Sequence, residues 1–268
     1  MATVAHFSDL HVCAPGVEIE PGIDASANAR HAVTHVLAMD PMPELVVLTG
    51  DLVNDGRPEQ YAELRACLEP LVPRLRLLPG NHDDLALLAD TFPEVPGLHG
   101  PNARFVSDVG AGTPGALRLV GLDSHRAGID GGRLDAEQLE WLDHVLMEEQ
   151  DTPTIVFLHH PVVPVGIAFM DAMRLDPADA EALGDVIERH GQVQRVASGH
   201  LHRATTVWWR NTVATTVPST VHAMDLQLTE RRPPGWRREP GQLAVHAVVE
   251  GRIVSHLAPL VEPEYRSF

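Results

Sequence analysis

The chain has 268 residues, 44% of them hydrophobic, and its 37 acidic and 20 basic side chains give a formal net charge of −17. This length allows one large domain with a full core, and so acidic a surface argues against long nucleic acids and anionic membranes as partners. Two cysteines, Cys13 and Cys67, are too few for a disulfide framework, so we interpret both as small buried hydrophobes in a reduced compartment.

The sequence predicts neither a targeting segment nor a membrane span. The N-terminus lacks a basic region followed by an apolar stretch, and residues typical of a folded strand begin within its first few positions. The most apolar window, residues 154–170, is interrupted by His159, His160 and two prolines. We therefore expect a cytoplasmic protein without a membrane partner.

Short apolar runs and segments with helical periodicity alternate along the chain. In chain order they predict strands at residues 4–7 and 45–48, a helix at 57–71, strands at 75–78 and 117–122, a helix at 135–147, a strand at 154–158, a helix at 176–190, and strands at 193–197 and 212–217. Pro58 occupies a first-turn position, Asp135 and Gln138 have capping-box spacing, and Gly191 is placed to end a helix. This alternation predicts an α/β fold, and the number of strands predicts two packed mixed sheets with helices outside.

The C-terminal region has a different character. Residues 231–241 are rich in proline and arginine and predict a loop or arm, whereas residues 243–250 and 252–257 flank a Glu-Gly pair and predict a hairpin. We therefore divide the chain into a main domain at residues 1–225 and a C-terminal arm and hairpin at residues 226–268.

Five clusters of polar residues follow predicted strands, at the strand ends where open α/β sheets place their sites. They are Asp9-Leu10-His11, Gly50-Asp51, Gly80-Asn81-His82-Asp83, His159-His160-Pro161 and Gly199-His200-Leu201-His202. Each cluster alone has an ordinary explanation as a turn or a solvated loop. Their conjunction has no shared structural explanation, because strand ends do not need carboxylates and imidazoles. A pair of metal ions does need them, and these oxygen and nitrogen ligands suit Fe, Mn, Co or Zn.

The spacing within the clusters agrees with a dimetal site. In an extended chain residues i and i+2 point the same way, so Asp9 and His11 would converge on one ion, as would His200 and His202. The missing side chain of Gly50 allows a close approach of the backbone, and the next residue, Asp51, has two carboxylate oxygens that can bridge two ions.

Charge arithmetic suggests the substrate class. Two divalent ions bring four positive charges, while Asp9, Asp51 and a bridging hydroxide return three negative ones. The resulting pocket is cationic and suits a compact monoanion such as a phosphate diester. A metal lowers the pKa of its bound water towards about 7, so we expect attack by a metal-bound hydroxide.

These clusters resemble, in order and spacing, the signature of the calcineurin-like metallophosphoesterase superfamily. Within it, the chain is similar to the class III cyclic-nucleotide phosphodiesterases and, more closely, to bacterial glycerophosphodiesterases. The resemblance spans roughly residues 3–225, and the motifs that carry it lie at residues 50–59, 79–84, 123–128, 159–161 and 219–222.

The resemblance implies a four-layer α-β-β-α sandwich with two metal ions at the C-terminal ends of the strands. One ion would be held by Asp9, His11, Asp51 and His202, and the other by Asp51, Asn81, His159 and His200. His82 would be a catalytic and substrate-binding residue facing the phosphate, or instead a residue that orients a ligand. His222 would also line the substrate pocket.

The function expected from these observations is hydrolysis of small phosphate diesters, either cyclic nucleotides or glycerophosphodiesters. A phosphomonoesterase of the same fold and a non-catalytic scaffold are the alternatives, although the presence of all seven ligand positions argues against a scaffold. We expect a homo-oligomer in which the C-terminal arm caps the site or contacts another copy. Seven further histidines are interpreted as structural or surface residues: His6, His31, His35, His144, His190, His246 and His256.

Overall fold

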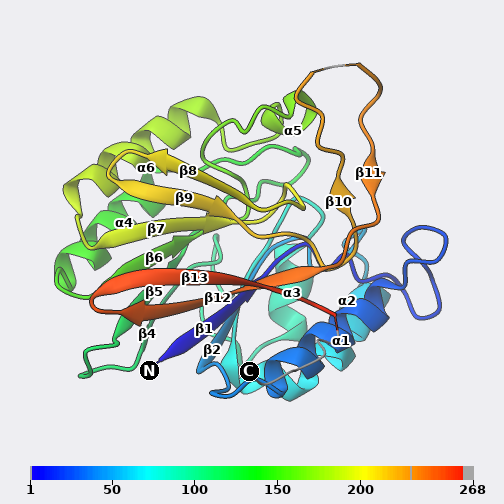
Figure 1. The fold of residues 1–268 in the computed structure, drawn as a ribbon, viewed down its shortest axis with the longest axis horizontal. Coiled ribbons are helices and arrows are strands. Elements are labelled where there is room, and N and C mark those ends of the chain that lie inside the picture. The colour runs from blue at the N-terminus through cyan, green and yellow to red at the C-terminus, as the bar shows by residue number, and fades with distance from the viewer. Residues whose placement is uncertain (1, 230, 262–268) are drawn as a thin grey trace, which may run out of the picture.

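Two β-sheets pack face to face in the computed structural model, which describes residues 2–229 and 231–261, and helices cover their outer faces (Figure 1). The first sheet has the strand order β13-β12-β1-β2-β3, with bounds Arg252–Pro259, Gln242–Val249, Thr3–Phe7, Leu45–Thr49 and Leu75–Leu78. In it β1, β2 and β3 run parallel, and β12 joins β1 in the antiparallel sense. The carboxyl ends of the three parallel strands therefore meet at one edge of the sheet.

The second sheet is also mixed. Its strand order is β4-β5-β6-β7-β9-β8, with bounds Phe105–Val109, Leu117–Gly121, Thr154–Phe157, Val193–Ser198, Thr212–Thr216 and Thr205–Trp209. The central strands β5, β6, β7 and β9 are parallel, and the two edge strands are antiparallel to their neighbours. The fold class expected from the sequence, an α/β fold with two packed mixed sheets, is confirmed.

Helices cover both outer faces of the sandwich. The first sheet is covered by α1 (Ala25–Leu37), α2 (Pro58–Leu68) and α3 (Leu85–Thr91). The second is covered by α4 (Ala136–Glu148) and α6 (Pro177–Arg189). The short α5 (Ala168–Asp171) lies apart, near the top of Figure 1. Aspartate N-caps begin α1, α3, α4 and α6. Among the described residues, none of the helices has the length and apolarity needed to cross a bilayer.

The predicted helix at residues 57–71 ends earlier than expected. α2 stops at Leu68, and the chain continues as a 3₁₀ helix over Glu69–Arg74. This segment contains Pro70 and Pro73, and proline both removes a backbone donor and disfavours α conformation in the residue before it.

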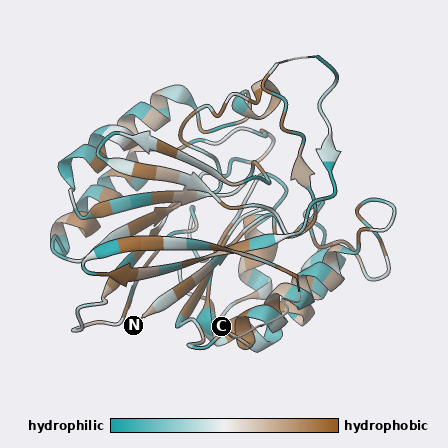
Figure 2. Cartoon of the chain, viewed as in Figure 1, coloured by the Kyte–Doolittle hydropathy of each residue, from teal (hydrophilic) through white to brown (hydrophobic). Residues whose placement is uncertain are grey.

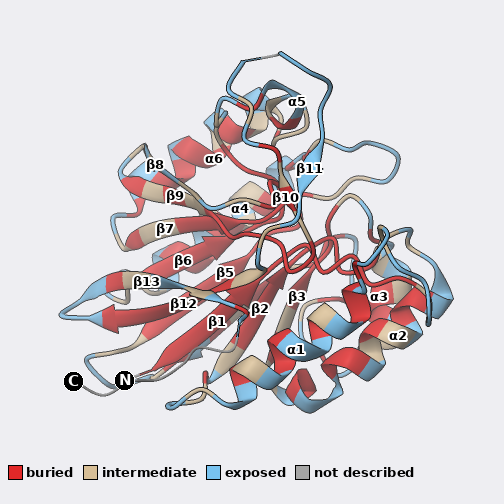
Figure 3. Cartoon of the chain, turned by 45° about the vertical axis from the view of Figure 1, so that its right-hand side comes forward, coloured by how far each residue is buried: buried red, intermediate tan, exposed pale blue. Residues whose placement is uncertain are grey.

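Alternate residues of the central strands face different layers of the core. Leu119, Ile155 and Phe157 belong to the cluster between the sheets, whereas Val120 and Val156 pack with α4 and α6. The central strands β1, β2, β5 and β6 are almost entirely buried, while the outward faces of the helices are exposed (Figure 3). Hydrophobic residues recur along the strands, and hydrophilic bands are visible on the hairpin strands β12 and β13 (Figure 2). Burial on both faces holds the strand ends, and the residues that follow them, in fixed positions.

The predicted C-terminal hairpin forms as β12 and β13. It lies within the first sheet, because β12 pairs with β1 from Thr3 to His6. An arm precedes it, in which the two-residue strands β10 (Ala223–Met224) and β11 (Trp236–Arg237) pair with each other (Figure 1). The division at residue 225 and the role of the C-terminal region remain predictions.

Candidate metal centre

The predicted ligands lie at the strand ends of both sheets. Asp9 and His11 follow β1, Asp51 follows β2, and Asn81 follows β3, so the first sheet supplies four of them. The second sheet supplies the other three from the ends of β6 and β7, namely His159, His200 and His202. The packing of the two sheets brings these residues together, although they are separated by as many as 193 positions in the chain.

The backbone at five of these positions is left-handed. The φ angles are 57° at Asp9, 46° at His11, 49° at Asp51, 68° at His200 and 51° at His202. The extended conformation expected for Asp9–His11 and for His200–His202 is therefore wrong. Asp9 and His11 do converge on one group of donors, whereas His200 and His202 belong to two different groups. Non-glycine residues in this region cost about 1–3 kcal/mol each and are concentrated at functional sites.

Glycines allow the ligand loops to approach one another closely. A Cβ atom on Gly50 would lie 2.5 Å from His159 Nδ1 and 2.6 Å from the backbone nitrogen of Gly80. On Gly80 a Cβ would overlap Asp51, and on Gly199 it would overlap Ser8. The close approach expected at Gly50 is confirmed, and it recurs at the other two glycines.

The first group of potential ligands consists of Asp9, His11, Asp51 and His202, all buried. His11 Nε2 lies 3.0 Å from His202 Nε2 and 3.7 Å from Asp51 Oδ2, and His202 Nε2 lies 3.3 Å from Asp9 Oδ1. Two imidazole nitrogens and two carboxylate oxygens thus point at one another. These donors suit a divalent cation bound among them.

The second group is centred on the ring of His159. Its Nε2 lies 3.2 Å from Asn81 Oδ1, 3.2 Å from His200 Nδ1 and 3.4 Å from Asp51 Oδ1. The four atoms again combine nitrogen and oxygen donors without a thiolate.

Asp51 faces both groups with different oxygens. Oδ2 is the atom near His11, and Oδ1 is the atom near His159. A carboxylate that bridges two ions requires this arrangement. The sequence suggested such a bridge only because a carboxylate has two oxygens.

The buried carboxylates are ionised, and positive charge is favoured beside them. Burial alone would raise the pKa of Asp9, but the charge of His202 lowers it to about 2. Burial alone would also raise the pKa of Asp51, but the charge of His159 lowers it well below its ordinary value. Burial alone would lower the pKa of His159, but Asp51 raises it to about 9. The centre therefore attracts cations.

Two of the histidines are held neutral. Burial lowers the pKa of His11 and of His200 to about 3. A neutral imidazole has one nitrogen lone pair, which is the form that binds a metal ion. The donor set, with its ionised carboxylates and the neutral rings of His11 and His200, therefore fits a pair of divalent ions.

Backbone carbonyls fix the orientation of two ligand rings. His159 Nδ1 lies 2.6 Å from the carbonyl oxygen of Thr49, which directs Nε2 into the second group. His202 Nδ1 lies 3.1 Å from the carbonyl oxygen of His222, which directs its Nε2 into the first group. Such partners fix the tautomer of a metal-binding histidine.

His160 differs from its neighbour His159. Its Nδ1 lies 2.8 Å from Ser124 Oγ and its Nε2 lies 3.1 Å from the carbonyl oxygen of Asp130, so both nitrogens have hydrogen-bond partners. Although its ring is close enough to His200 to form part of a possible ligand group, these bonds make it a structural support.

His82 and His222 lie at the edge of the centre. The His82 ring is 4.8 Å from that of His11, with Nδ1 2.6 Å from the carbonyl oxygen of Asn54, and its side chain is exposed. Burial alone would lower the pKa of His82, but the charge of Asp51 raises it above its ordinary value. The half-buried His222 ring lies 4.7 Å from that of His202 and 5.3 Å from that of Trp236 in the arm.

Asp83 supports the centre in a way that the sequence analysis missed. Its buried carboxylate accepts hydrogen bonds from the backbone nitrogens of Gly80 at 2.8 Å, Leu52 at 3.1 Å and Val53 at 3.2 Å. It thereby joins the loop after β2 to the loop after β3, which carry Asp51 and Asn81. The sequence does place Asp83 in the Gly80–Asp83 cluster. From sequence alone, however, an aspartate that holds two loops together looks the same as one that binds a metal ion.

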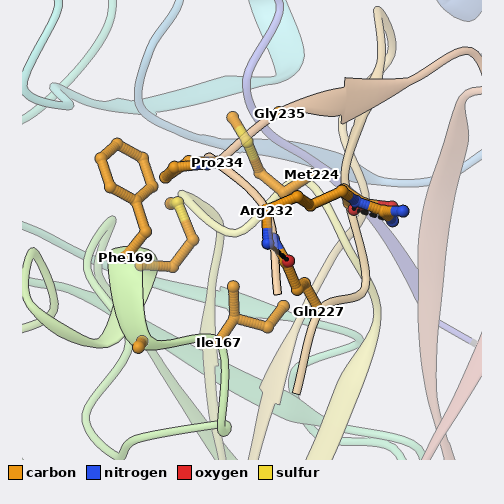
Figure 4. Close-up of a pocket in the computed structure, with 10 residues that line it drawn as sticks. Ile167, Phe169, Met224, Gln227, Arg232, Pro234 and Gly235 are labelled. Carbon is orange, nitrogen blue, oxygen red and sulfur yellow. Dashed lines mark hydrogen bonds and ion pairs between the residues drawn. The ribbon is translucent and has the colours of Figure 1, made fainter. Parts of the chain in front are cut away.

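An open cleft of about 710 Å³ lies beside the second group. Asn81, His82, His125 and Arg126 contribute to its lining. A second cavity, of about 310 Å³, lies between α5 and the arm and is lined mainly by apolar residues such as Ile167, Phe169 and Met224 (Figure 4). It contains none of the predicted ligands, whereas the larger cleft is lined by Asn81, and a smaller cavity of about 150 Å³ is lined by His202 and His222.

Comparison with known proteins assigns the chain to a family. Residues 2–204 match the model of the calcineurin-like phosphoesterases. The chain belongs to this family. The prediction made from the five motifs is therefore confirmed, and the chain is a phosphoester hydrolase. The family uses two divalent metal ions, and the two ligand groups are suited to such a pair without selecting a particular metal.

Relatives in the family agree over nearly the whole chain. The glycerophosphodiester phosphodiesterase GpdQ of Enterobacter lignolyticus (strain SCF1) is 33% identical over 257 residues, which cover 94% of this chain and 89% of the relative. A probable cyclic nucleotide phosphodiesterase of Rhodococcus erythropolis is 32% identical, over 96% of this chain and 83% of that protein. Among solved structures, a dimetal phosphatase from Danio rerio has the same fold, with a TM-score of 0.71, 17% identity and 97% of each chain covered.

Proposed function

We propose that this member of the family hydrolyses small phosphate diesters, either glycerophosphodiesters or cyclic nucleotides, with two divalent metal ions. The observation that carries the proposal is the orientation of Asp51, whose two carboxylate oxygens face two separate groups of donors. Bound there, the ions would lower the pKa of a water molecule and polarise a phosphoryl oxygen.

The residues proposed to hold the ions are those that converge in the two groups. Asp9, His11 and His202 would complete one site with Asp51, and Asn81, His159 and His200 the other. The polar contacts with Thr49 and His222 would keep the rings of two of these histidines oriented.

His82 is proposed to contact the substrate phosphate. It is exposed in the cleft and adjacent in sequence to Asn81, and its ring nitrogen Nδ1 is engaged with the carbonyl of Asn54. Nε2 is therefore the nitrogen left to donate to a phosphoryl oxygen or to the departing alkoxide. His222, beside His202 and Trp236, is proposed to contact the substrate near the first metal site.

Two observations favour diesters over monoesters. The relatives that cover most of the chain are named as phosphodiesterases of glycerophosphodiesters or of cyclic nucleotides. The cleft also has an acidic lining, with Asp55, Asp84, Asp135 and Glu137 at its exposed positions. A substrate with one negative charge is repelled less by this lining than one with two.

The test is hydrolysis by purified protein that has been depleted of metal and reloaded with Mn²⁺, Co²⁺ or Zn²⁺. We expect bis(p-nitrophenyl) phosphate to be cut faster than p-nitrophenyl phosphate, with activity rising to a maximum at two ions per chain. Glycerophosphoethanolamine and cyclic AMP then separate the two natural classes. Faster cleavage of the monoester would assign the chain to the phosphomonoesterases, and metal binding without turnover of any ester would favour a non-catalytic scaffold.

The C-terminal arm is proposed to cap the site or to contact another copy of the chain. The contact of Trp236 with His222, whose rings lie 5.3 Å apart and are tilted by 43°, supports the first role, and the exposed Leu226 and Leu228 support the second. Two measurements on the chain with and without residues 226–234 distinguish them. Loss of a cap changes the KM in a kinetic assay, and loss of an oligomer contact changes the mass in sedimentation. A cytoplasmic location remains a prediction.

A further inference from the structure

Arg126 lies in the cleft on a loop that is fixed beside the second metal site. The loop follows β5, where Leu122 N donates to the carbonyl of Phe157 at 2.8 Å. Ser124 Oγ, two residues before Arg126, lies 2.8 Å from His160 Nδ1. These contacts hold the loop next to the carboxyl end of β6, and His159 follows that end two residues later. Arg126 therefore lines the same cleft as Asn81 and His82.

Arg126 is the single arginine among the described residues that line this cleft, and none of them is lysine. Three hydrogen bonds tie its guanidinium to neighbouring residues of the protein. Nη2 lies 2.7 Å from Asp135 Oδ2, and Nη1 donates to the carbonyl of His125 at 2.7 Å and to Asn102 Oδ1 at 3.2 Å. Asn102 Nδ2 in turn donates to Asp135 Oδ2 at 3.3 Å. The guanidinium is thus paired with a carboxylate and directed towards Asp135.

This ion pair bears on the choice of substrate. A phosphate diester carries one negative charge, whereas a monoester is close to two at neutral pH because its second pKa is about 6. The additional charge requires an additional cation, and a free guanidinium is the group that best matches phosphate oxygens. The pair turns the one guanidinium that lines the cleft towards Asp135.

We infer that the Arg126–Asp135 ion pair sets the preference for diesters, with Asp135 as the specificity-determining residue. The inference rests on the proposed function, because it explains a preference that the metal ions alone do not impose. Loss of the Asp135 charge would free Arg126 for the second charge of a monoester. The pair is partly exposed, with 30% of the Arg126 side chain and 44% of the Asp135 side chain accessible, so the arginine can turn towards the cleft once released.

Asp135 also has a structural role that the experiment must preserve. It is the N-cap of α4, and its Oδ1 accepts a hydrogen bond from Gln138 N at 2.9 Å. Asparagine is as good an N-cap as aspartate, so Asp135→Asn keeps the cap and removes only the charge. Asp135→Ser is a second variant that also caps the helix.

The measurement is the ratio of kcat/KM for p-nitrophenyl phosphate to that for bis(p-nitrophenyl) phosphate, at pH 8 and fixed ionic strength. We expect Asp135→Asn to raise this ratio about tenfold, which is the effect of one hydrogen bond to a charged group. The double variant Asp135→Asn/Arg126→Gln should lose the gain, because the freed guanidinium is then absent.

Glu137→Gln is the matched control. Glu137 lines the same cleft, but its partner is Arg104, whose Nη1 lies 3.2 Å from Glu137 Oε1, so the variant removes one negative charge without releasing Arg126. A rise confined to Asp135→Asn supports the inference. An equal rise in both variants, or no rise in a folded Asp135→Asn protein with its metals bound, overturns it.

Calorimetric titration with inorganic phosphate separates this inference from the proposed function. At pH 8 phosphate is mainly a dianion, so Asp135→Asn should bind it about tenfold more tightly than the wild type. Equal affinities overturn the inference, whichever ester the enzyme cuts. If the wild type cuts neither ester, the proposed function fails, and the phosphate titration still tests the role of the ion pair.

Discussion

Asp51 is the residue on which both metal sites depend, because its Oδ2 faces His11 and its Oδ1 faces His159. We predict that Asp51→Ala abolishes tight binding of both ions, whereas Asp9→Ala weakens mainly the site of His11 and His202. Metal analysis after gel filtration should give close to zero ions per chain in the first variant and close to one in the second. Two ions per chain in Asp51→Ala would contradict the bridging role.

His159 and His160 are adjacent and buried, yet they have different partners. His159 Nε2 faces Asn81, His200 and Asp51, so His159→Ala should lose one ion per chain. Both nitrogens of His160 are used by Ser124 and by a backbone carbonyl, so His160→Ala should keep both ions. The His160→Ala substitution should lower the free energy of unfolding by about 1–3 kcal/mol, because the buried Ser124 hydroxyl would lose its His160 partner. Loss of metal from the His160 variant alone would reverse the assignment.

At the scale of elements, the loops after the strands are shaped by close contacts that a glycine permits. A Cβ on Gly80 would overlap the Asp51 carboxylate and lie 2.8 Å from His159 Nε2. Gly80→Ala should therefore displace the bridging carboxylate, lower metal content and destabilise the fold by about 1–3 kcal/mol.

Gly191 provides the control for this substitution. A Cβ there would meet nothing within 4 Å, so Gly191→Ala should keep full metal content and change stability by no more than about 0.5 kcal/mol. Chemical denaturation together with metal analysis measures both effects. Full metal occupancy in Gly80→Ala would show that the loops can separate without loss of the centre.

The strands that carry ligands were predictable because both of their faces are buried. The runs ending at Phe7, Leu48 and Leu78 are almost continuously apolar, which is the pattern of central parallel strands. β8 was not predicted, because this edge strand alternates between half-buried and exposed residues and ends with two tryptophans. α1 was also missed, since its buried face consists largely of alanine and serine, which give little hydrophobic contrast.

The ligand residues could be proposed from sequence, but their backbone geometry could not. Aspartate and histidine adopt positive φ more often than most residues, but no local pattern marks these five positions, which are held by contacts between distant loops. Ser219 Oγ, for example, donates to the carbonyl of Asp9 at 2.8 Å across 210 positions of the chain. The ion pair of Arg126 with Asp135, nine positions apart in the chain, was also missed, because nothing in either segment indicates the other.

At the scale of the whole molecule, the two sheets enclose a pair of histidines away from the metal centre. The rings of His6 and His246 are stacked 5.6 Å apart, and His6 packs edge-on against Phe157 of the opposite sheet. His6 Nε2 lies 2.9 Å from Thr49 Oγ1, and His246 Nδ1 lies 2.7 Å from Ser255 Oγ. The interpretation of both as structural residues agrees with these contacts.

Burial between the sheets makes this histidine pair a source of acid sensitivity. Burial lowers the pKa of His6 to about 3, and burial and then the charge of His6 lower that of His246 well below its ordinary value. In the unfolded chain each ring takes up a proton near pH 6.5. The unfolded state therefore binds more protons than the folded state below that pH, so stability is full above about pH 6.5 and is lost as the pH falls towards the folded pKa.

We predict that His246→Gln reduces this loss. Each histidine kept neutral by folding should steepen the fall in unfolding free energy by up to about 1.4 kcal/mol per pH unit below pH 6.5. Urea denaturation at pH 8, 7, 6 and 5, with a chelator present, should give a shallower fall in the variant, even though its stability at pH 8 is lower. His256→Gln, at an exposed position on the other strand of the same hairpin, controls for the loss of a histidine. If the fall is equally steep in the wild type and in His246→Gln, then His246 takes up its proton while the two sheets remain packed.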